Sequence, residues 1–226
     1  MQNKQYDVCL NVLRRLEEAG VLRHVVLVGS WCLVLYREYF RGVGDLSAVR
    51  TRDMDFLVPA TGKMDPKVDV PALLKDLGFI VGFRGDQGAM MLEHPELMIE
   101  FLVTERGRGS DKLKYLPELG MNAQPLRFMD IAASKTVLLH FGDVPVTVPH
   151  PAAFVLHKLL VVPRRRETEK REKDLASALA VLELLEAKGD LPLVREILES
   201  FPPTWKKTIL RVLQDNGADH WTKKLA

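Results

Sequence analysis

The chain has 226 residues, of which 47% are hydrophobic, so it is long enough to bury a sizeable core in one large domain or two small ones. Its 32 basic and 30 acidic residues leave a formal net charge of +2, which argues against a protein that coats nucleic acid electrostatically, while a local basic patch stays open. The chain has two cysteines and no CxxC pair, which argues against a disulfide framework or a structural zinc site. The polar N-terminal residues and the lack of a long apolar run predict a soluble cytoplasmic protein with no membrane partner.

Hydrophobic periodicity predicts alternating helices and strands up to residue 148. Helices are expected at 5–19, 31–40 and 71–78. Strands are expected at 24–28, 52–58, 79–83, 89–93, 97–103 and 144–148. The last of these is expected at a sheet edge, because Pro145 has no N–H for a ladder. Ser30 is expected to cap the helix that follows it, and loops are expected at 42–47, 59–66 and 105–125.

The pattern changes at Pro149 and is helical from there onward. Helices are expected at about 151–161, 168–188, 191–200 and 203–215. We therefore predict an α+β protein with two domains, a mixed-sheet core with an N-terminal helix at 1–148 and a helical domain at 149–226.

Two acids separated by one residue, Asp53 and Asp55, lie in the predicted strand at 52–58. Because residues i and i+2 of a strand point to the same face, the two carboxylates are expected side by side. Like charges at this distance are costly to bury without a counter-charge. Hard carboxylate oxygens suit a divalent cation, so we predict Mg²⁺ or Mn²⁺ here.

Two further features are expected to meet this acidic pair. Gly29 and Ser30 join a strand to a helix, where free backbone N–H groups and the Ser30 hydroxyl would suit a phosphate. Glu100 is an acid within the apolar strand at 97–103, and a metal shared with Asp53 and Asp55 would supply its partner. Three carboxylates near a phosphate-binding turn are the equipment of two-metal phosphoryl or nucleotidyl transfer.

This order of features resembles the nucleotidyltransferase superfamily that includes DNA polymerase β, poly(A) polymerases and small antibiotic adenylyltransferases. The resemblance covers roughly residues 20–185 and is nearest to uncharacterised bacterial members and the toxin-like branch linked to abortive infection. It implies a mixed-sheet nucleotidyltransferase core, Asp53, Asp55 and Glu100 as catalytic metal ligands, and nucleotide binding at Gly29 and Ser30. Many relatives also carry a helical Lys followed by a Lys-Asp pair, which implies nucleotide-binding roles for Lys158, Lys173 and Asp174.

The sequence departs from the family pattern in one spacing. Between Ser30 and Asp53 lie 22 residues, about twice the common family gap. Either the helix after Ser30 is longer, or the stretch 41–50 is an inserted loop. Gly42 and Gly44 favour the loop.

Structural interpretations stand beside these functional ones. The Gly29-Ser30 pair can be a plain turn, and the acids can be solvated residues at a strand end or sheet edge. Lys158 can extend its amine from an apolar helix face to water, and Asp174 can be a salt-bridge acid at the start of a helix. The mixed-sign run 163–173 can be a solvated helix face.

We expect a Mg-dependent nucleotidyltransferase that moves NMP from an NTP to a hydroxyl acceptor by a two-metal mechanism. The acceptor stays open among RNA, above all tRNA, protein and a small molecule, as do the NTP base and the oligomeric state. The alternatives are a non-catalytic nucleotide- or RNA-binding member of the fold, or the toxin of a toxin–antitoxin pair with an antitoxin protein as partner.

Overall fold

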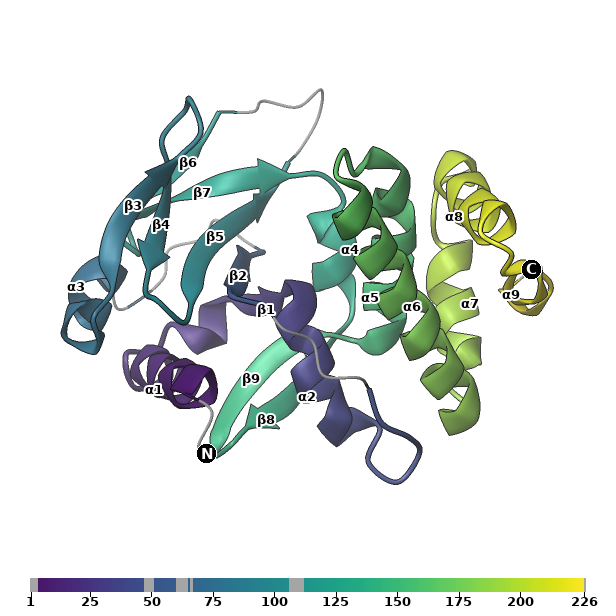
Figure 1. The fold of residues 1–226 in the computed structure, drawn as a ribbon, viewed down its shortest axis with the longest axis horizontal. Helices are drawn as coiled ribbons and strands as arrows, with labels where there is room; N and C mark the ends of the chain where they lie inside the picture. The colour runs from purple at the N-terminus through teal and green to yellow at the C-terminus, as the bar shows by residue number, and fades with distance from the viewer. Residues whose placement is uncertain (1–3, 47–50, 60–64, 66, 106–111, 226) are drawn as a thin grey trace.

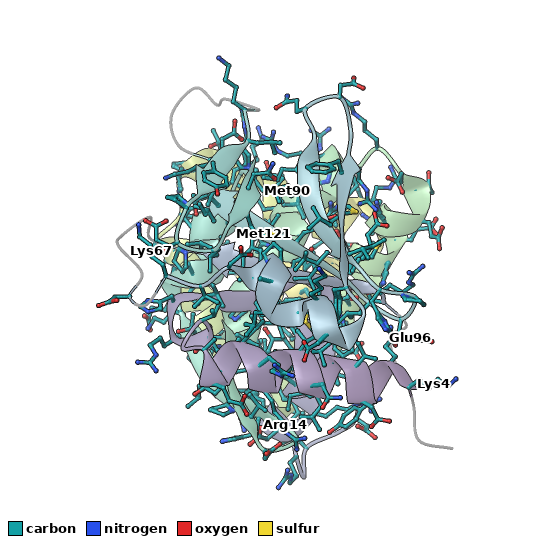
Figure 2. All side chains as sticks on the ribbon, turned by 90° about the vertical axis from the view of Figure 1, so that its left-hand side faces the viewer. Lys4, Arg14, Lys67, Met90, Glu96 and Met121 are labelled. Carbon is teal, nitrogen blue, oxygen red and sulfur yellow. The ribbon has the colours of Figure 1, made fainter. Side chains whose placement is uncertain are left out.

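The computed structural model describes residues 4–46, 51–59, 65, 67–105 and 112–225. Figure 1 shows a large sheet on one side of the molecule, a stack of C-terminal helices on the other, and a two-stranded hairpin beneath the sheet. Figure 2 views the sheet side, where helix α1 lies across the molecule below the strands, with Lys4 at one of its ends. The expected α+β fold with a C-terminal helical region is therefore confirmed.

The helices are α1 (Lys4–Glu18), α2 (Cys32–Tyr39), α3 (Val70–Leu74), α4 (Met129–Ser134), α5 (Pro151–Val161), α6 (Thr168–Lys188), α7 (Leu191–Glu199), α8 (Pro203–Asp215) and α9 (Asp219–Leu225). Short 3₁₀ turns are η1 (Leu22–His24), η2 (Gly29–Trp31), η3 (Lys75–Leu77) and η4 (Val162–Arg164). The strands are β1 (Val26–Val28), β2 (Asp53–Val58), β3 (Ile80–Arg84), β4 (Ala89–Glu93), β5 (Met98–Thr104), β6 (Lys114–Leu116), β7 (Met121–Leu126), β8 (Thr136–Phe141) and β9 (Val144–Pro149).

The large sheet is mixed and has the strand order β1-β2-β5-β4-β3. Strand β2 runs antiparallel to β1 and parallel to β5. Strand β7 pairs in parallel with the second half of β5 and carries β6 on its other side. The register places Asp55 opposite Val28 on one neighbour and opposite Glu100 on the other, so β1, β2 and β5, the first three strands of this order, carry the residues of the predicted site.

The two faces of β2 carry different side chains because successive residues alternate. Met54, Phe56 and Val58 are buried in the main core, which continues under the sheet. The opposite face begins with Asp53 and Asp55 and ends with Leu57, which packs in a small second cluster with residues of α4. Helix α4 therefore closes the apolar end of this face and leaves the acidic end uncovered by that cluster.

Helix α5 is the centre of the helical half. Nine of its eleven residues are buried, and it packs against α4, α6, α7 and α8. The main core runs from α1 to α9 and includes residues of both halves of the chain. Strand β9 ends at Pro149 and α5 begins at Pro151, where the composition changes, and the division into two domains at this point stays a prediction. Within the described ranges, no helix combines the length and apolar character needed to cross a membrane.

The expected loop at 105–125 is wrong over its second half. Strands β6 and β7 lie there, while 106–111 fall outside the described residues. Strand β7 reads Met-Asn-Ala-Gln-Pro-Leu, which has no β-branched residue and contains a proline, so local propensity points away from a strand. Pairing with β5 on one side and β6 on the other overrides that propensity. Strand β9 was expected, but its partner β8 was not, and α4 and α9 were also missed.

The long gap before Asp53 does not lengthen the helix. Helix α2 has eight residues and ends at Tyr39, and the described part of the stretch that follows has no helix or strand before Asp53. Residues 47–50 of the expected inserted loop, and 60–64 and 66 of the expected loop at 59–66, lie outside the described residues. The expected Ser30 cap is wrong, because the first residues form the 3₁₀ turn η2 and the N-cap position of α2 is Trp31, with no side-chain cap.

Candidate active site

Gly29 lies at the turn where β1 ends, directly against the acidic strand. Its φ is +77°, in the left-handed region that favours glycine. A Cβ atom at this position would lie 2.6 Å from Oδ2 of Asp55. Only a residue without a side chain can hold the backbone this close to the carboxylate, so the turn and the acid form one site.

Asp53, Asp55 and Glu100 share one face of the sheet. Asp53 and Asp55 alternate along β2, and Glu100 lies opposite Asp55 on the parallel strand β5. Asp53 is exposed, whereas Asp55 and Glu100 are half-buried. The structure therefore places the three predicted acids on one face of two neighbouring strands, β2 and β5.

Burial and neighbouring acids raise the pKa of Asp55 and of Glu100. Burial raises the pKa of Asp55 to about 7, with further contributions from the negative charges of Glu100 and Asp53. The positive charges of Lys158 and Arg165 act in the opposite direction on Asp55. Burial also raises the pKa of Glu100, and Asp53 adds to this effect. The site thus holds more negative charge than its neighbours neutralise.

Glu100 has a cationic partner that the sequence analysis missed. Nη1 of Arg84, at the end of β3, lies 3.2 Å from Oε1 of Glu100 and lowers the pKa of that carboxyl against the effect of burial. Arg84 comes from the outer strand of the sheet, two strands away from β5. An arginine that ends an apolar strand carries no local sign of this pairing, which depends on the strand order.

The donor set of the three acids fits a hard divalent cation, because all the ligand atoms are carboxylate oxygens. The excess negative charge around Asp55 and the side-chain-free space at Gly29 fit it as well. Across the described ranges, however, no three Asp, Glu, His or Cys side chains are grouped closely enough to hold a metal ion. Glu100 is paired with Arg84 instead, so it would have to exchange that partner to join Asp53 and Asp55 around a metal.

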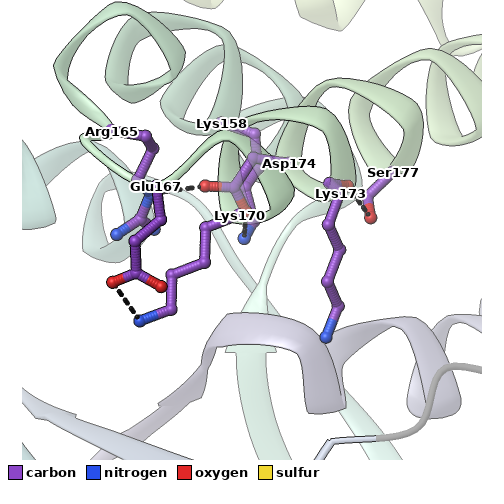
Figure 3. Close-up of polar contacts among 7 residues, drawn as sticks. All are labelled: Lys158, Arg165, Glu167, Lys170, Lys173, Asp174 and Ser177. Atoms are coloured by element: carbon purple, nitrogen blue, oxygen red, sulfur yellow. Dashed lines mark hydrogen bonds and ion pairs between the residues drawn. The ribbon is translucent and has the colours of Figure 1, made fainter.

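Lys158 and Asp174 form a buried ion pair beside the acids. Lys158 of α5 is 6% exposed and Asp174 of α6 is 5% exposed, and the lysine amine contacts Oδ1 of the aspartate directly. Nε of Arg165 lies 2.7 Å from Oδ2 of the same carboxylate (Figure 3). Burial works to raise the pKa of Asp174, but the two cations outweigh it and hold that pKa below its ordinary value. Asp174 thereby positions Lys158, whose charge reaches Asp55.

Lys173, the other predicted nucleotide-binding residue of α6, does not share this pair. Figure 3 shows its side chain extending away from Asp174, while its backbone carbonyl accepts a hydrogen bond of 2.7 Å from Oγ of Ser177. In the same first turns of α6, Lys170 lies 3.1 Å from Glu167 on the exposed surface. The mixed-sign run is therefore partly a solvated helix face, through Lys170 and Glu167, and partly, through Arg165, a partner of the buried Asp174.

Comparisons with known proteins agree with this geometry. A family model described as Nucleotidyltransferase matches residues 8–201, which is most of the chain. No curated protein matches the chain. Among solved structures, an antigenic nucleotidyltransferase-like protein from Paracoccidioides brasiliensis is 12% identical, with a TM-score of 0.55 over 99% of this chain and 93% of its own.

Two structures of the antibiotic-resistance factor ANT(2″)-Ia are also similar. One, a crystal structure in complex with adenylyl-2″-tobramycin, is 12% identical with a TM-score of 0.48 over 86% of this chain and 98% of its own. The other, a solution structure, is 14% identical with a TM-score of 0.47 over 88% and 97%. The fold, the acidic face and above all the family model that spans residues 8–201 lead to one conclusion: the chain belongs to the nucleotidyltransferase family.

Proposed function

We propose that the protein transfers NMP from an NTP to a hydroxyl acceptor, with Mg²⁺ or Mn²⁺ bound at the acidic face. One observation carries the proposal. The turn at Gly29, the acid Asp55 and the acid Glu100 follow one another on adjacent strands β1, β2 and β5. The turn and the acids to which we assign phosphate and metal binding thus follow one another across one face of the sheet.

Each of these residues has a distinct task in the proposal. The backbone at Gly29 and the Ser30 hydroxyl bind the triphosphate of the NTP. Asp53 and Asp55 would hold the divalent cation, and Glu100 would join them on releasing Arg84. A divalent ion bound there supplies neutralisation of the phosphate charge that develops during transfer. Lys158, positioned by Asp174, and Lys173 add positive charge on the side of the helical half.

The transfer is an in-line displacement at the α-phosphorus. The acceptor oxygen forms a bond to this phosphorus while the bond to the oxygen that bridges the α- and β-phosphates breaks. Pyrophosphate leaves with that electron pair. Glu100, whose pKa burial raises, accepts the proton of the acceptor hydroxyl and passes it to solvent.

The test is label transfer from the four α-³²P-NTPs with Mg²⁺ to total RNA, protein extract or a small-molecule pool. Asp55→Asn should abolish transfer, because it removes a metal ligand without changing side-chain size. Asp215→Asn, at an exposed position of α8, is the matched control and should keep full activity. Equal transfer by the Asp55 variant would refute the mechanism.

The alternatives make different predictions. A non-catalytic nucleotide- or RNA-binding protein would keep its cellular role in an Asp53→Asn, Asp55→Asn double variant. The toxin of a toxin–antitoxin pair, including a member of the abortive-infection branch, would arrest growth on expression and be relieved by an antitoxin encoded beside it. Growth arrest that requires Asp55 would unite the toxin role with the proposed chemistry, with tRNA or protein as the acceptor.

A further inference from the structure

A cavity of about 590 Å³ lies between the end of β5 and the helices α4 and α8, and a smaller one of about 370 Å³ lies on the sheet side of the molecule. Of these two, the smaller is bounded by Arg84, which contacts the acid Glu100. It lies between the β3–β4 turn and the second half of β7. Its walls include Arg84, Asp86, Gln87, Leu113, Gln124 and Pro125. Because Arg84 is also the partner of Glu100, this cavity adjoins the third acid of the site.

The register places the cavity on the same face as the acids. Gln124 of β7 lies opposite Leu102 of the parallel strand β5, and residues in register share a face. Leu102 is two residues from Glu100, so its side chain also points to that face. Gln124 and Glu100 therefore lie on one side of the sheet, on neighbouring strands.

The side-chain amide of Asn122 holds the wall of the cavity in place. The side-chain oxygen of Asn122 accepts a hydrogen bond of 2.7 Å from the backbone N–H of Met90. Its side-chain nitrogen donates one of 3.1 Å to the carbonyl of Gly88. These two bonds fasten the β3–β4 turn to β7, the region where Figure 2 labels Met90 and Met121. The two bonds therefore fix the position of Gln87, in the turn, relative to Gln124, on β7, across the cavity.

The positions of Gly29, Asp55 and Glu100 across the sheet indicate which substrate the cavity would bind. Gly29 lies on one side of Asp55, and Glu100 with the cavity lies on the other. In-line displacement requires the attacking oxygen and the leaving pyrophosphate on opposite sides of the α-phosphorus. With the triphosphate at Gly29, the attacking hydroxyl arrives from the side of Glu100. Resting on the proposed function, we infer that this cavity binds the acceptor, a neutral polyhydroxylated small molecule such as a sugar or a cyclitol.

The chemistry of the lining selects this class of acceptor. The amides of Gln87 and Gln124 both donate and accept hydrogen bonds, and Asp86 accepts them, as hydroxyl groups require. Leu113 and Pro125 offer apolar surface to the C–H faces of a ring. An RNA backbone would need several cations, whereas the described lining residues carry one cation, Arg84, and one acid, Asp86, so their charges cancel. The volume falls in the range of small-molecule sites.

The experiment measures ligand binding directly, without turnover. The protein is loaded with Mg²⁺ and the α,β-methylene analogues of the four NTPs, which cannot transfer NMP. Saturation-transfer NMR is then recorded with D-glucose, myo-inositol and sucrose as neutral probes. D-glucosamine and a short single-stranded RNA serve as the cationic and anionic arms. We expect at least one neutral probe to bind, with little binding in the other two arms.

The variants locate the binding. Gln124→Ala should weaken the neutral probe at least tenfold, while its affinity for the NTP analogue changes less than twofold. Gln214→Ala, an exposed glutamine of α8, is the matched control and should change neither. Equal binding of the probe by Gln124→Ala, or binding of RNA or glucosamine alone, would overturn the inference, as would a protein that holds the NTP analogue but ignores every neutral probe. A protein that binds no NTP analogue would instead overturn the proposed function.

Discussion

The most quantitative prediction concerns Asp55 in the metal-free protein. Burial and the neighbouring acids raise the pKa of Asp55 to about 7, whereas its ordinary value is 3.8. Between these two values the folded state keeps a proton that the unfolded chain has lost. The free energy of unfolding therefore falls as pH rises from about 4 to about 7, and the loss is complete above pH 7.

The size of the loss follows from the pKa difference. At 1.36 kcal/mol per pKa unit, the folded protein loses about 4 kcal/mol above pH 7 from this one carboxylate. Asp55→Asn keeps the size of the side chain and cannot ionise. It should therefore be more stable than the natural protein by up to about 4 kcal/mol at pH 8, which for a chain of this length is roughly a 10 °C rise in Tm.

The assay is thermal and urea unfolding of both proteins in EDTA at pH 4 and pH 8. The stability gain should be present at pH 8 and nearly vanish at pH 4, where Asp55 is protonated in the folded protein. Asp53→Asn, at an exposed position, should change stability by less than about 1 kcal/mol and serves as the control. An Asp55 variant that is no more stable than the natural protein at pH 8 would contradict this prediction.

Three further predictions follow from the packing around the site. Gly29→Ala should abolish transfer and destabilise the fold by about 1–2 kcal/mol from backbone strain alone, because its Cβ would meet the Asp55 carboxylate; activity and urea unfolding test this. Asp174→Ala should destabilise the protein by about 3–5 kcal/mol, because it leaves Lys158 buried without a counter-charge, as measured by urea unfolding. Burial lowers the pKa of His157 to about 3, so the natural protein should lose stability as pH falls from about 6.5 to 3. Unfolding experiments across this pH range should show that His157→Gln removes up to about 4–5 kcal/mol of that loss.

Matched control variants separate these effects from nonspecific effects of substitution on stability and activity. Gly42→Ala has the same backbone strain at φ +80° but meets no atom within 4 Å, so it should leave activity intact. Glu167→Ala breaks only an exposed ion pair and should cost less than about 1 kcal/mol. Full activity in Gly29→Ala, an Asp174 variant as stable as the Glu167 variant, or an unchanged pH profile in the His157 variant would each contradict the corresponding prediction.

The parts of the site that lie within one element could be predicted from the sequence. The two-residue period of a strand predicts that Asp53 and Asp55 share a face, and the structure confirms it. The strand-to-helix turn at Gly29 was also predicted, because a glycine after a buried β-branched strand marks such a turn. Local rules failed only at Ser30, where a 3₁₀ turn replaces the expected cap.

The remaining geometry depends on contacts between distant segments. Glu100 meets Asp55 because β2 and β5 pair in parallel, with 39 residues between the two strands, and no local pattern specifies that pairing. Arg84 reaches Glu100 because of the strand order, and Lys158 meets Asp174 because α5 packs on α6. Strand β7 was missed for the same reason, since its pairing on both sides outweighs a sequence that disfavours strands.

A crystal structure of the protein with Mn²⁺ and an α,β-methylene NTP, with the metal located by its anomalous scattering, would test the proposed metal and nucleotide sites together. We predict Mn²⁺ between Asp53 and Asp55, the triphosphate against the turn at Gly29, and Glu100 released from Arg84 toward the metal. Nucleotide bound with no Mn²⁺ at these acids, or with its triphosphate away from Gly29, would contradict the account.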